Sequence, residues 1–171
     1  MRATGHSRRR ALVSMAPLLA LAVLLQGCGF QLQGRVPLPA TLNSTWIDTD
    51  DDQTDFVIDL RRALRASGAQ LATRREEATS VLRIGRDTLT ESVLSVSGRN
   101  VPREIELIYT VRLEVQGGGR TLLPDEQFVV SRELSFNESQ LLAKEREQEV
   151  LRAALARDLV GVVMRRLSSL P

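Results

Sequence analysis

Residues 105–115 read IELIYTVRLEV, a run in which nearly every second side chain is apolar. The apolar positions are Ile105, Leu107, Tyr109, Val111, Leu113 and Val115, and the residues between them are mostly polar. Because successive side chains of a β-strand point to opposite faces of the sheet, this alternation predicts a strand with one face in a core and the other in water. One-sided burial of this kind is typical of antiparallel sheets.

Two further long strands are expected beside this run, at about residues 81–96 and 121–136. The connecting segments SGRN (residues 97–100) and GGGR (residues 117–120) both contain glycine, which tight hairpin turns require. Consecutive strands joined by short turns usually pair with each other. The three strands are therefore expected to form an antiparallel sheet with residues 105–115 in the middle.

Shorter elements are predicted before these strands. STWID (residues 44–48) indicates a short strand, and another is expected around Leu71. Between them, a helix is predicted to begin at a cap on Asp52 or Thr54, to run to Ala66 and to stop at Gly68.

The last segment, residues 139–170, predicts a long helix. Asn137 and Gln140 resemble a capping box, and the buried stripe is expected at Leu151, Leu155, Leu159 and Val162. The whole order of elements predicts an α+β two-layer domain, with an antiparallel or mixed sheet of four to five strands and two helices packed on one face.

The first 27 residues have the layout of an export signal. Four arginines precede an uncharged apolar run from Ala11 to Leu25, which is too short to span a bilayer comfortably. The run ends in LQGC (residues 25–28), a lipobox-like arrangement that predicts lipidation of Cys28, the only cysteine in the chain. The alternative is a structural cysteine close to the end of a signal peptide. Residues 28–42 are expected to form a lipidated tether, and residues 43–171 a single α+β domain.

Composition argues against several classes of function. With 43% hydrophobic and 26% charged residues, the chain has enough apolar side chains for one globular core. Removal of the signal takes away four of the 23 basic residues and leaves 19 against 21 acidic ones, so the mature chain is not basic enough to suggest a nucleic-acid partner.

The mature chain also has few groups suited to catalysis. The single histidine, His6, leaves with the signal, and Cys28 would carry the lipid, so the usual metal ligands and the commonest general base are absent. We therefore expect no catalytic residues, no metal and no cofactor other than the lipid on Cys28. A hydrolase that depends on carboxylates alone is a weaker alternative.

An ordered set of segments resembles the LptE family of LPS-assembly lipoproteins. The set comprises LQGCGFQLQG (residues 25–34), a following LP, STWIDTD (residues 44–50), a long hairpin with a basic, glycine-containing tip, and LLAKEREQE (residues 141–149) at the start of the last helix. The match extends over nearly the whole mature chain.

The resemblance implies an outer-membrane lipoprotein that faces the periplasm. It implies that the domain sits as a plug inside the β-barrel of LptD, helps that barrel assemble, and binds lipopolysaccharide on its way to the cell surface. Gly29, where inner-membrane lipoproteins commonly have aspartate, agrees with the outer membrane. The alternative is a periplasmic scaffold lipoprotein that binds protein or cell wall without lipopolysaccharide.

A lipopolysaccharide ligand would present phosphates, which arginine can bind in bidentate fashion. The chain direction brings the turn with Arg99, the nearby Arg103 and the first turns of the last helix to the same end of the sheet. Lys144 lies in those first turns and is the only lysine in the chain. We therefore predict one phosphate-binding edge made by Arg99 and Lys144, with Arg103 as the other candidate for the tip residue. The alternative for each is an ordinary solvated side chain.

Overall fold

The computed structural model of the protein describes residues 37–135 and 141–171, and it describes the side chains of the last helix from residue 148 onward. The predicted signal peptide, Cys28, most of the tether and the capping pair Asn137 and Gln140 lie outside the described residues. All elements below belong to one compact unit.

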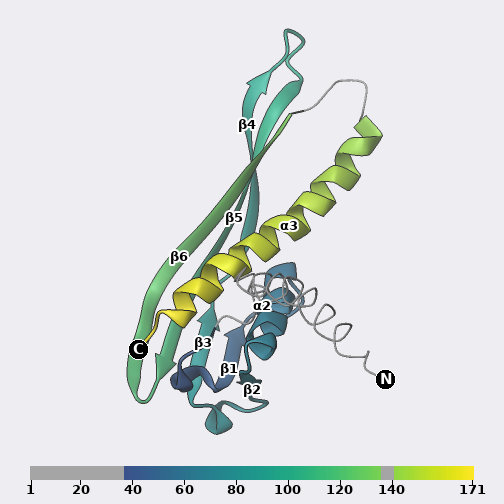
Figure 1. Cartoon of the computed structure of the whole chain (residues 1–171). Helices are drawn as coiled ribbons and strands as arrows, with labels where there is room; N and C mark the ends of the chain where they lie inside the picture. The colour runs from purple at the N-terminus through teal and green to yellow at the C-terminus, as the bar shows by residue number, and fades with distance from the viewer. Residues whose placement is uncertain (1–36, 136–140) are drawn as a thin grey trace, which may run out of the picture. The chain divides into compact units, whose positions relative to one another are not determined.

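The fold is α+β, as predicted (Figure 1). The strands are β1 (Ser44–Thr49), β2 (Gln70–Leu71), β3 (Ser80–Ile84), β4 (Thr88–Val96), β5 (Pro102–Gly117) and β6 (Arg120–Ser135). The helices are α2 (Asp55–Ala66) and α3 (Leu141–Ser168), with short 3-10 turns at η1 (Ala40–Leu42) and η2 (Arg75–Glu77). The described part of the chain thus has six strands, rather than the four to five expected.

The long strand β5 organises the sheet. β6 pairs antiparallel with one side of β5, while β3 and β4 pair antiparallel with its other side, one after the other. β1 extends the sheet beyond β3 and is parallel to both β3 and β2. The sheet is therefore mixed, and β5 has a partner strand on both sides along nearly its whole length.

The prediction of a single strand over residues 81–96 was wrong, because the chain breaks between β3 and β4. Ile84 pairs with Leu113 of β5, and Thr88 pairs with Thr110. The chain therefore advances four residues between β3 and β4 while β5 advances three, and the one extra residue is accommodated as in a β-bulge. Gly85 lies at this break and donates its N–H to the carbonyl of Arg112 at 2.9 Å.

Both predicted hairpin turns are present. Gly118 and Gly119 join β5 to β6 with φ angles of 60° and 75°, the conformation that favours glycine in two-residue hairpins. The β4–β5 turn is closed by hydrogen bonds from the Ser97 N–H to the Val101 carbonyl (2.8 Å) and from the Val101 N–H to the Ser97 hydroxyl (3.2 Å). This hairpin tip extends away from the part of the sheet that α2 covers (Figure 1).

The core lies between the helices and one face of the sheet. Thr54 caps α2 by accepting a hydrogen bond from the Val57 N–H, and Phe56, Val57, Leu60 and Leu64 are buried. In α3, Leu155 and Leu159 are buried as expected, but Leu151 and Val162 are only partly buried. The buried face of α3 is wider than the predicted stripe because this helix packs against both α2 and the sheet, and it also includes Ala156, Val160, Val163, Met164 and Leu167. Neither described helix is both long and apolar enough to cross a membrane.

Candidate functional site

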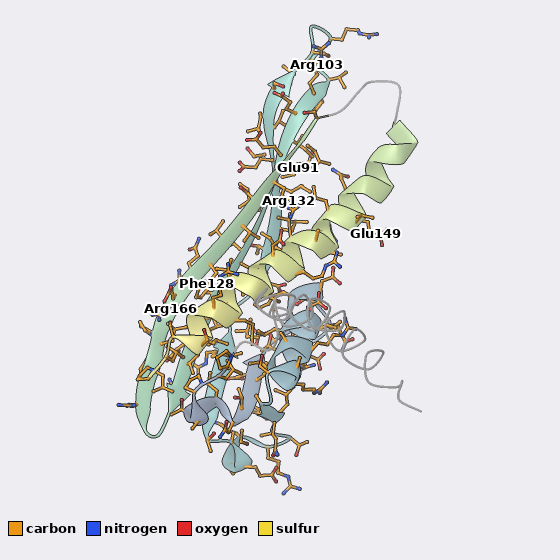
Figure 2. The ribbon with its side chains drawn as sticks, viewed as in Figure 1. Glu91, Arg103, Phe128, Arg132, Glu149 and Arg166 are labelled. Atoms are coloured by element: carbon orange, nitrogen blue, oxygen red, sulfur yellow. The ribbon has the colours of Figure 1, made fainter. Side chains whose placement is uncertain are left out.

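The hairpin tip carries two of the three predicted ligand-binding cations. Arg99 lies in the turn between β4 and β5. Arg103 is the second residue of β5 and lies near the hairpin tip (Figure 2). Both side chains are exposed. Lys144 lies near the start of α3, but its side chain is outside the described part of the chain, so its meeting with the two arginines stays a prediction.

A local irregularity distinguishes Arg103 from other strand residues. Val93 pairs with Ile105, Ser95 with Glu104 and Val96 with Pro102, so Leu94 and Arg103 have no partner in the ladder. Such bulges bend a strand and redirect side chains. Within the described residues, no carboxylate forms an ion pair with Arg103. Its guanidinium is thus available to an external anion.

Carboxylates restrict where an anion could approach this hairpin. Glu106 and Glu133 are directly opposite each other on β5 and β6, on the face of the sheet away from the core. Glu104 lies on the same face and accepts a hydrogen bond from the Ser95 hydroxyl at 2.7 Å. Like charges on neighbouring strands repel each other and any phosphate. An anion is therefore favoured at the tip itself, beside Arg99 and Arg103, and disfavoured on the acidic face.

Many other arginines have carboxylate partners. The pairs are Arg61 with Asp52 (3.5 Å), Arg62 with Asp59 (2.9 Å), Arg74 with Glu77 (3.9 Å), Arg83 with Asp48 (3.3 Å) and Glu114 (3.7 Å), Arg112 with Asp125, Arg132 with Asp158, and Arg166 with Glu126 (3.1 Å). The hydrogen bonds from Asp125 raise the pKa of Arg112 above its ordinary value. These side chains belong to ion-paired surfaces.

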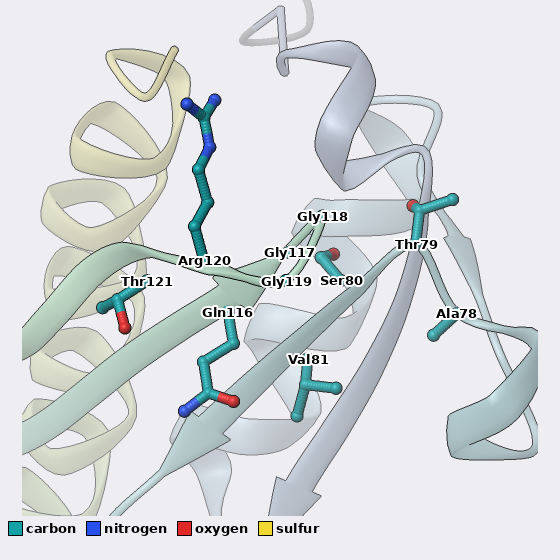
Figure 3. Close-up of a pocket in the computed structure, with 10 residues that line it drawn as sticks. All are labelled: Ala78, Thr79, Ser80, Val81, Gln116, Gly117, Gly118, Gly119, Arg120 and Thr121. Carbon is teal, nitrogen blue, oxygen red and sulfur yellow. The ribbon is translucent and has the colours of Figure 1, made fainter.

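A hollow of about 500 Å³ lies at the opposite end of β5 and was not anticipated from the sequence (Figure 3). Its lining consists of Ala78, Thr79, Ser80, Val81, Gln116, Gly117, Gly118, Gly119, Arg120 and Thr121. Arg120 is the only charged side chain among them, and Figure 3 shows it extending away from the glycine turn. With one cation and otherwise small neutral groups, this hollow is a weaker anion site than the hairpin tip.

Two smaller hollows lie between α3 and the sheet. One of about 450 Å³ is lined by Leu89, Glu91, Leu107 and the α3 residues Gln148, Glu149 and Arg152, and the other, of about 350 Å³, by the start of α2 with Asp87, Tyr109 and Arg152. In both, carboxylates face the single arginine. Their mixed charge does not favour an anion.

Tyr109 has a structural role, as the sequence indicated. It is only 5% exposed, and its hydroxyl donates to Asp87 Oδ2 at 2.6 Å. Burial, followed by the hydrogen bond and the charge of Asp87, raises the pKa of Tyr109 well above its ordinary value and so favours the neutral phenol. Among the described residues, moreover, no group of three or more histidine, cysteine or acidic side chains could hold a metal ion.

Known proteins are similar in sequence to most of this chain. A family model described as LptE, "Lipopolysaccharide-assembly", matches residues 40–167. The LPS-assembly lipoprotein LptE of Pectobacterium atrosepticum is 28% identical over 154 residues, covering 88% of this chain and 82% of that protein. The protein of the same name from Yersinia pestis (strain Pestoides F) is 30% identical over 154 residues, covering 88% of this chain and 73% of that protein.

Solved structures have the same fold. The NMR structure of an uncharacterized lipoprotein B from Nitrosomonas europaea is 25% identical, with a TM-score of 0.68 over 82% of this chain and 91% of that one. The crystal structure of the rare lipoprotein B from Shewanella oneidensis, at 24% identity, has a TM-score of 0.66 over 74% of this chain and 95% of that one. The fold of this chain is thus similar to those of these two bacterial lipoproteins.

Proposed function

This chain belongs to the LptE lipopolysaccharide-assembly family, and on that premise we propose that it is an outer-membrane lipoprotein that plugs and helps assemble the LptD β-barrel and binds lipopolysaccharide during its transport. Cys28 would carry the lipid anchor and hold the domain on the periplasmic side of the membrane. The role is non-enzymatic. The observation that carries the proposal is the family match over residues 40–167, which covers nearly all of the described domain.

The fold suits a plug. A barrel lumen needs a domain that keeps its shape, and here β5 and β6 pair over most of their length while two helices bury one face of the sheet. Ion pairs between β6 and α3, from Arg132 to Asp158 and from Arg166 to Glu126, further join the two layers.

Lipopolysaccharide would be bound through its phosphates at the hairpin tip. Arg99 and Arg103 lie there, and Lys144 is the third candidate. Each guanidinium can form two parallel hydrogen bonds to a phosphate, which both strengthens and orients the contact. By competing for these phosphates, the tip would weaken the association of lipopolysaccharide molecules with one another.

Affinity isolation tests the barrel part of the proposal. The full-length protein, tagged at its C-terminus, should co-purify from detergent-solubilised outer membranes with LptD in a stable complex, and mass spectrometry of the mature N-terminus should show an acylated Cys28. Recovery of peptidoglycan or of another periplasmic protein, without a barrel, would instead support a scaffold function and overturn the proposal.

Charge reversal tests the lipopolysaccharide part. Charge-assisted contacts contribute on the order of 1.5–3 kcal/mol each, so Arg99→Asp combined with Lys144→Asp should weaken lipopolysaccharide binding by more than about tenfold. Arg103→Asp alone decides between the two tip candidates. The measurement is equilibrium binding of purified lipopolysaccharide.

The control for charge should leave the ion pairs of α2 intact. Arg61 and Arg62 are in ion pairs, so reversing them would also disturb Asp52 and Asp59. Arg65→Asp combined with Arg75→Asp is a better match, because both residues are exposed and lie away from the hairpin tip. Equal losses in the two double variants would mean that only overall charge matters and that no localised site exists.

A further inference from the structure

Two long strands have a free side in this sheet. β4 and β6 each pair with β5, and within residues 37–135 and 141–171 neither has a strand on its outer side. An edge strand leaves backbone N–H and C=O groups unpaired, and these can template the addition of another strand. Proteins usually protect such edges with charged residues, proline, bulges or a covering element.

The β6 edge has these protections. Pro124 interrupts its backbone donors, and the strand carries five charged residues, Arg120, Asp125, Glu126, Arg132 and Glu133. Two of these, Glu126 and Arg132, are ion-paired to α3, which holds the helix near this side of the sheet. Strand addition along β6 would have to desolvate several charges.

The β4 edge lacks most of these protections. Its sequence, TLTESVLSV, contains no proline and one charged residue, Glu91. Val93, Leu94 and Val96 are 51%, 47% and 51% exposed, and they account for half of the large hydrophobic residues that are exposed in the described chain. From Thr88 to Val93 the pairing with β5 is regular, and only after Val93 does a bulge disturb it.

We propose that residues 88–93 of β4 bind an extended segment of the barrel partner by strand addition. Six residues of antiparallel strand span about 20 Å, enough for several main-chain hydrogen bonds. This inference rests on the proposed function, because it assigns the added strand to the partner that the plug would meet.

The side chains of β4 define the chemistry of the added strand. Leu89, Glu91 and Val93 lie opposite buried residues of β5 and so belong to the core-facing side, whereas Thr88, Thr90 and Ser92 belong to the other side. On the core-facing side, the added segment should therefore carry aliphatic residues beside Leu89 and Val93 and a basic residue opposite Glu91. On the other side of the sheet, beside Thr88, Thr90 and Ser92, it should carry small or hydroxyl residues.

Cross-linking in the intact complex tests the geometry of this contact. A photoreactive amino acid is placed at Ser92, at Val93 and, as a control on the other edge, at Val129, in the full-length lipoprotein purified with its barrel partner. Strand addition predicts that adducts from Ser92 and Val93 map to consecutive residues of one partner segment. The β4 amides should also exchange with deuterium at least about tenfold more slowly in the complex than in the free protein.

A matched pair of substitutions tests how much the added strand contributes to formation of the complex. Val93→Lys and Val129→Lys introduce the same change at similarly exposed valines of the two edges. Val93→Lys should reduce the yield of the complex by about tenfold with little change in melting temperature, since a lysine on an edge disfavours pairing, while Val129→Lys should leave the yield unchanged. If Val93→Lys does not fold, Ser92→Lys replaces it.

The outcomes separate this inference from the proposed function. A complex that forms normally, but shows unprotected β4 amides, scattered cross-links or equal effects of the two lysines, overturns strand addition and leaves the plug function intact. Cross-links from Ser92 and Val93 to lipid rather than to polypeptide also overturn it. Failure to recover any barrel complex removes the proposed function and strand addition together.

Discussion

β3 and β4 lie end to end along the same side of β5, yet their surroundings are opposite. Leu82 and Ile84 in β3 are 0% and 4% exposed, whereas Val93 and Val96 in β4 are each 51% exposed. Both strands contain several aliphatic residues, three of five in β3 and four of nine in β4, so the presence of such residues does not by itself explain the difference. The explanation is coverage: Leu82 and Ile84 belong to the core cluster that includes the buried residues of α2, whereas Val93 and Val96 lie outside it. In addition, β1 pairs with β3 along its whole length, and no described strand continues beyond it along β4.

The two parts of the sheet have different roles. Apolar side chains in the β3 half contribute to the free energy of unfolding because folding removes them from water. The aliphatic side chains of β4 remain largely hydrated in the free protein, so they contribute little to its stability and can contribute to binding. Substitutions in the two halves should therefore differ sharply.

The largest expected difference comes from a matched leucine pair. Leu82→Ala should lower the free energy of unfolding by about 2–5 kcal/mol, because it removes buried methyl groups and leaves a cavity. Leu94→Ala, at a side chain that is 47% exposed, should change it by less than about 0.5 kcal/mol. Urea unfolding of residues 29–171, followed by circular dichroism, measures both. Similar losses of unfolding free energy in the two variants would show that Leu94 is also buried in solution, contrary to the difference described here.

A pH titration examines the junction between the two strands, where Tyr109 bonds to Asp87. The pKa of Tyr109 is raised in the folded protein, so its contribution to stability is fully present below the unfolded value of about 10 and is lost as the pH rises above it. Stability should fall above pH 10 by up to about 1.4 kcal/mol per pH unit.

Tyr109 is the only tyrosine, so Tyr109→Phe is a direct control. The variant should lose stability near neutral pH, because Asp87 loses its hydrogen-bond donor, but should show a much smaller alkaline slope. Ultraviolet absorbance of tyrosinate, together with urea unfolding at each pH, measures both effects. The same alkaline slope in the variant and the parent protein would assign the effect to other groups.

The smallest expected change in the free energy of unfolding comes from removing the N-cap of α2. Thr54→Ala removes the side-chain acceptor of the Val57 N–H and should cost about 1 kcal/mol. Thr88→Ala, a matched change in exposed β4, should cost less than about 0.5 kcal/mol. Thermal unfolding distinguishes the two, and neither variant should alter lipopolysaccharide binding. A larger loss for Thr88→Ala would assign β4 a structural role.

Much of the local structure was predictable. The helix cap, predicted at Asp52 or Thr54 and found at Thr54, the glycine turns and the alternation of β5 were all read from short stretches of sequence, because each depends on a few neighbouring residues. The break between β3 and β4 also had a local signal, since a glycine within a strand pattern often marks a bulge, and Gly85 is such a residue. The prediction overlooked it because the aliphatic residues continue on both sides.

The candidate site was predictable only in part. The order of the strands placed Arg99 and Arg103 at one end of the sheet, and the structure agrees. The opposing Glu106 and Glu133, by contrast, are 27 positions apart in the sequence and become neighbours only through the register of β5 and β6. Their mutual repulsion, which disfavours an anion on that face of the sheet, therefore could not be read from the sequence.

Local sequence patterns were enough to predict most of the strands and both helices, the apolar face of β5 and the positions of its hairpin turns, because these properties follow from backbone preference and from the two-residue period of a strand. Long-range packing was needed to establish that β1 inserts between β2 and β3, that its pairing with β3 ends before β4, and that Val93, Leu94 and Val96 stay exposed. Burial is non-local: an aliphatic side chain is removed from water only if a distant segment packs on it, and no pattern within its own strand specifies whether that segment reaches it.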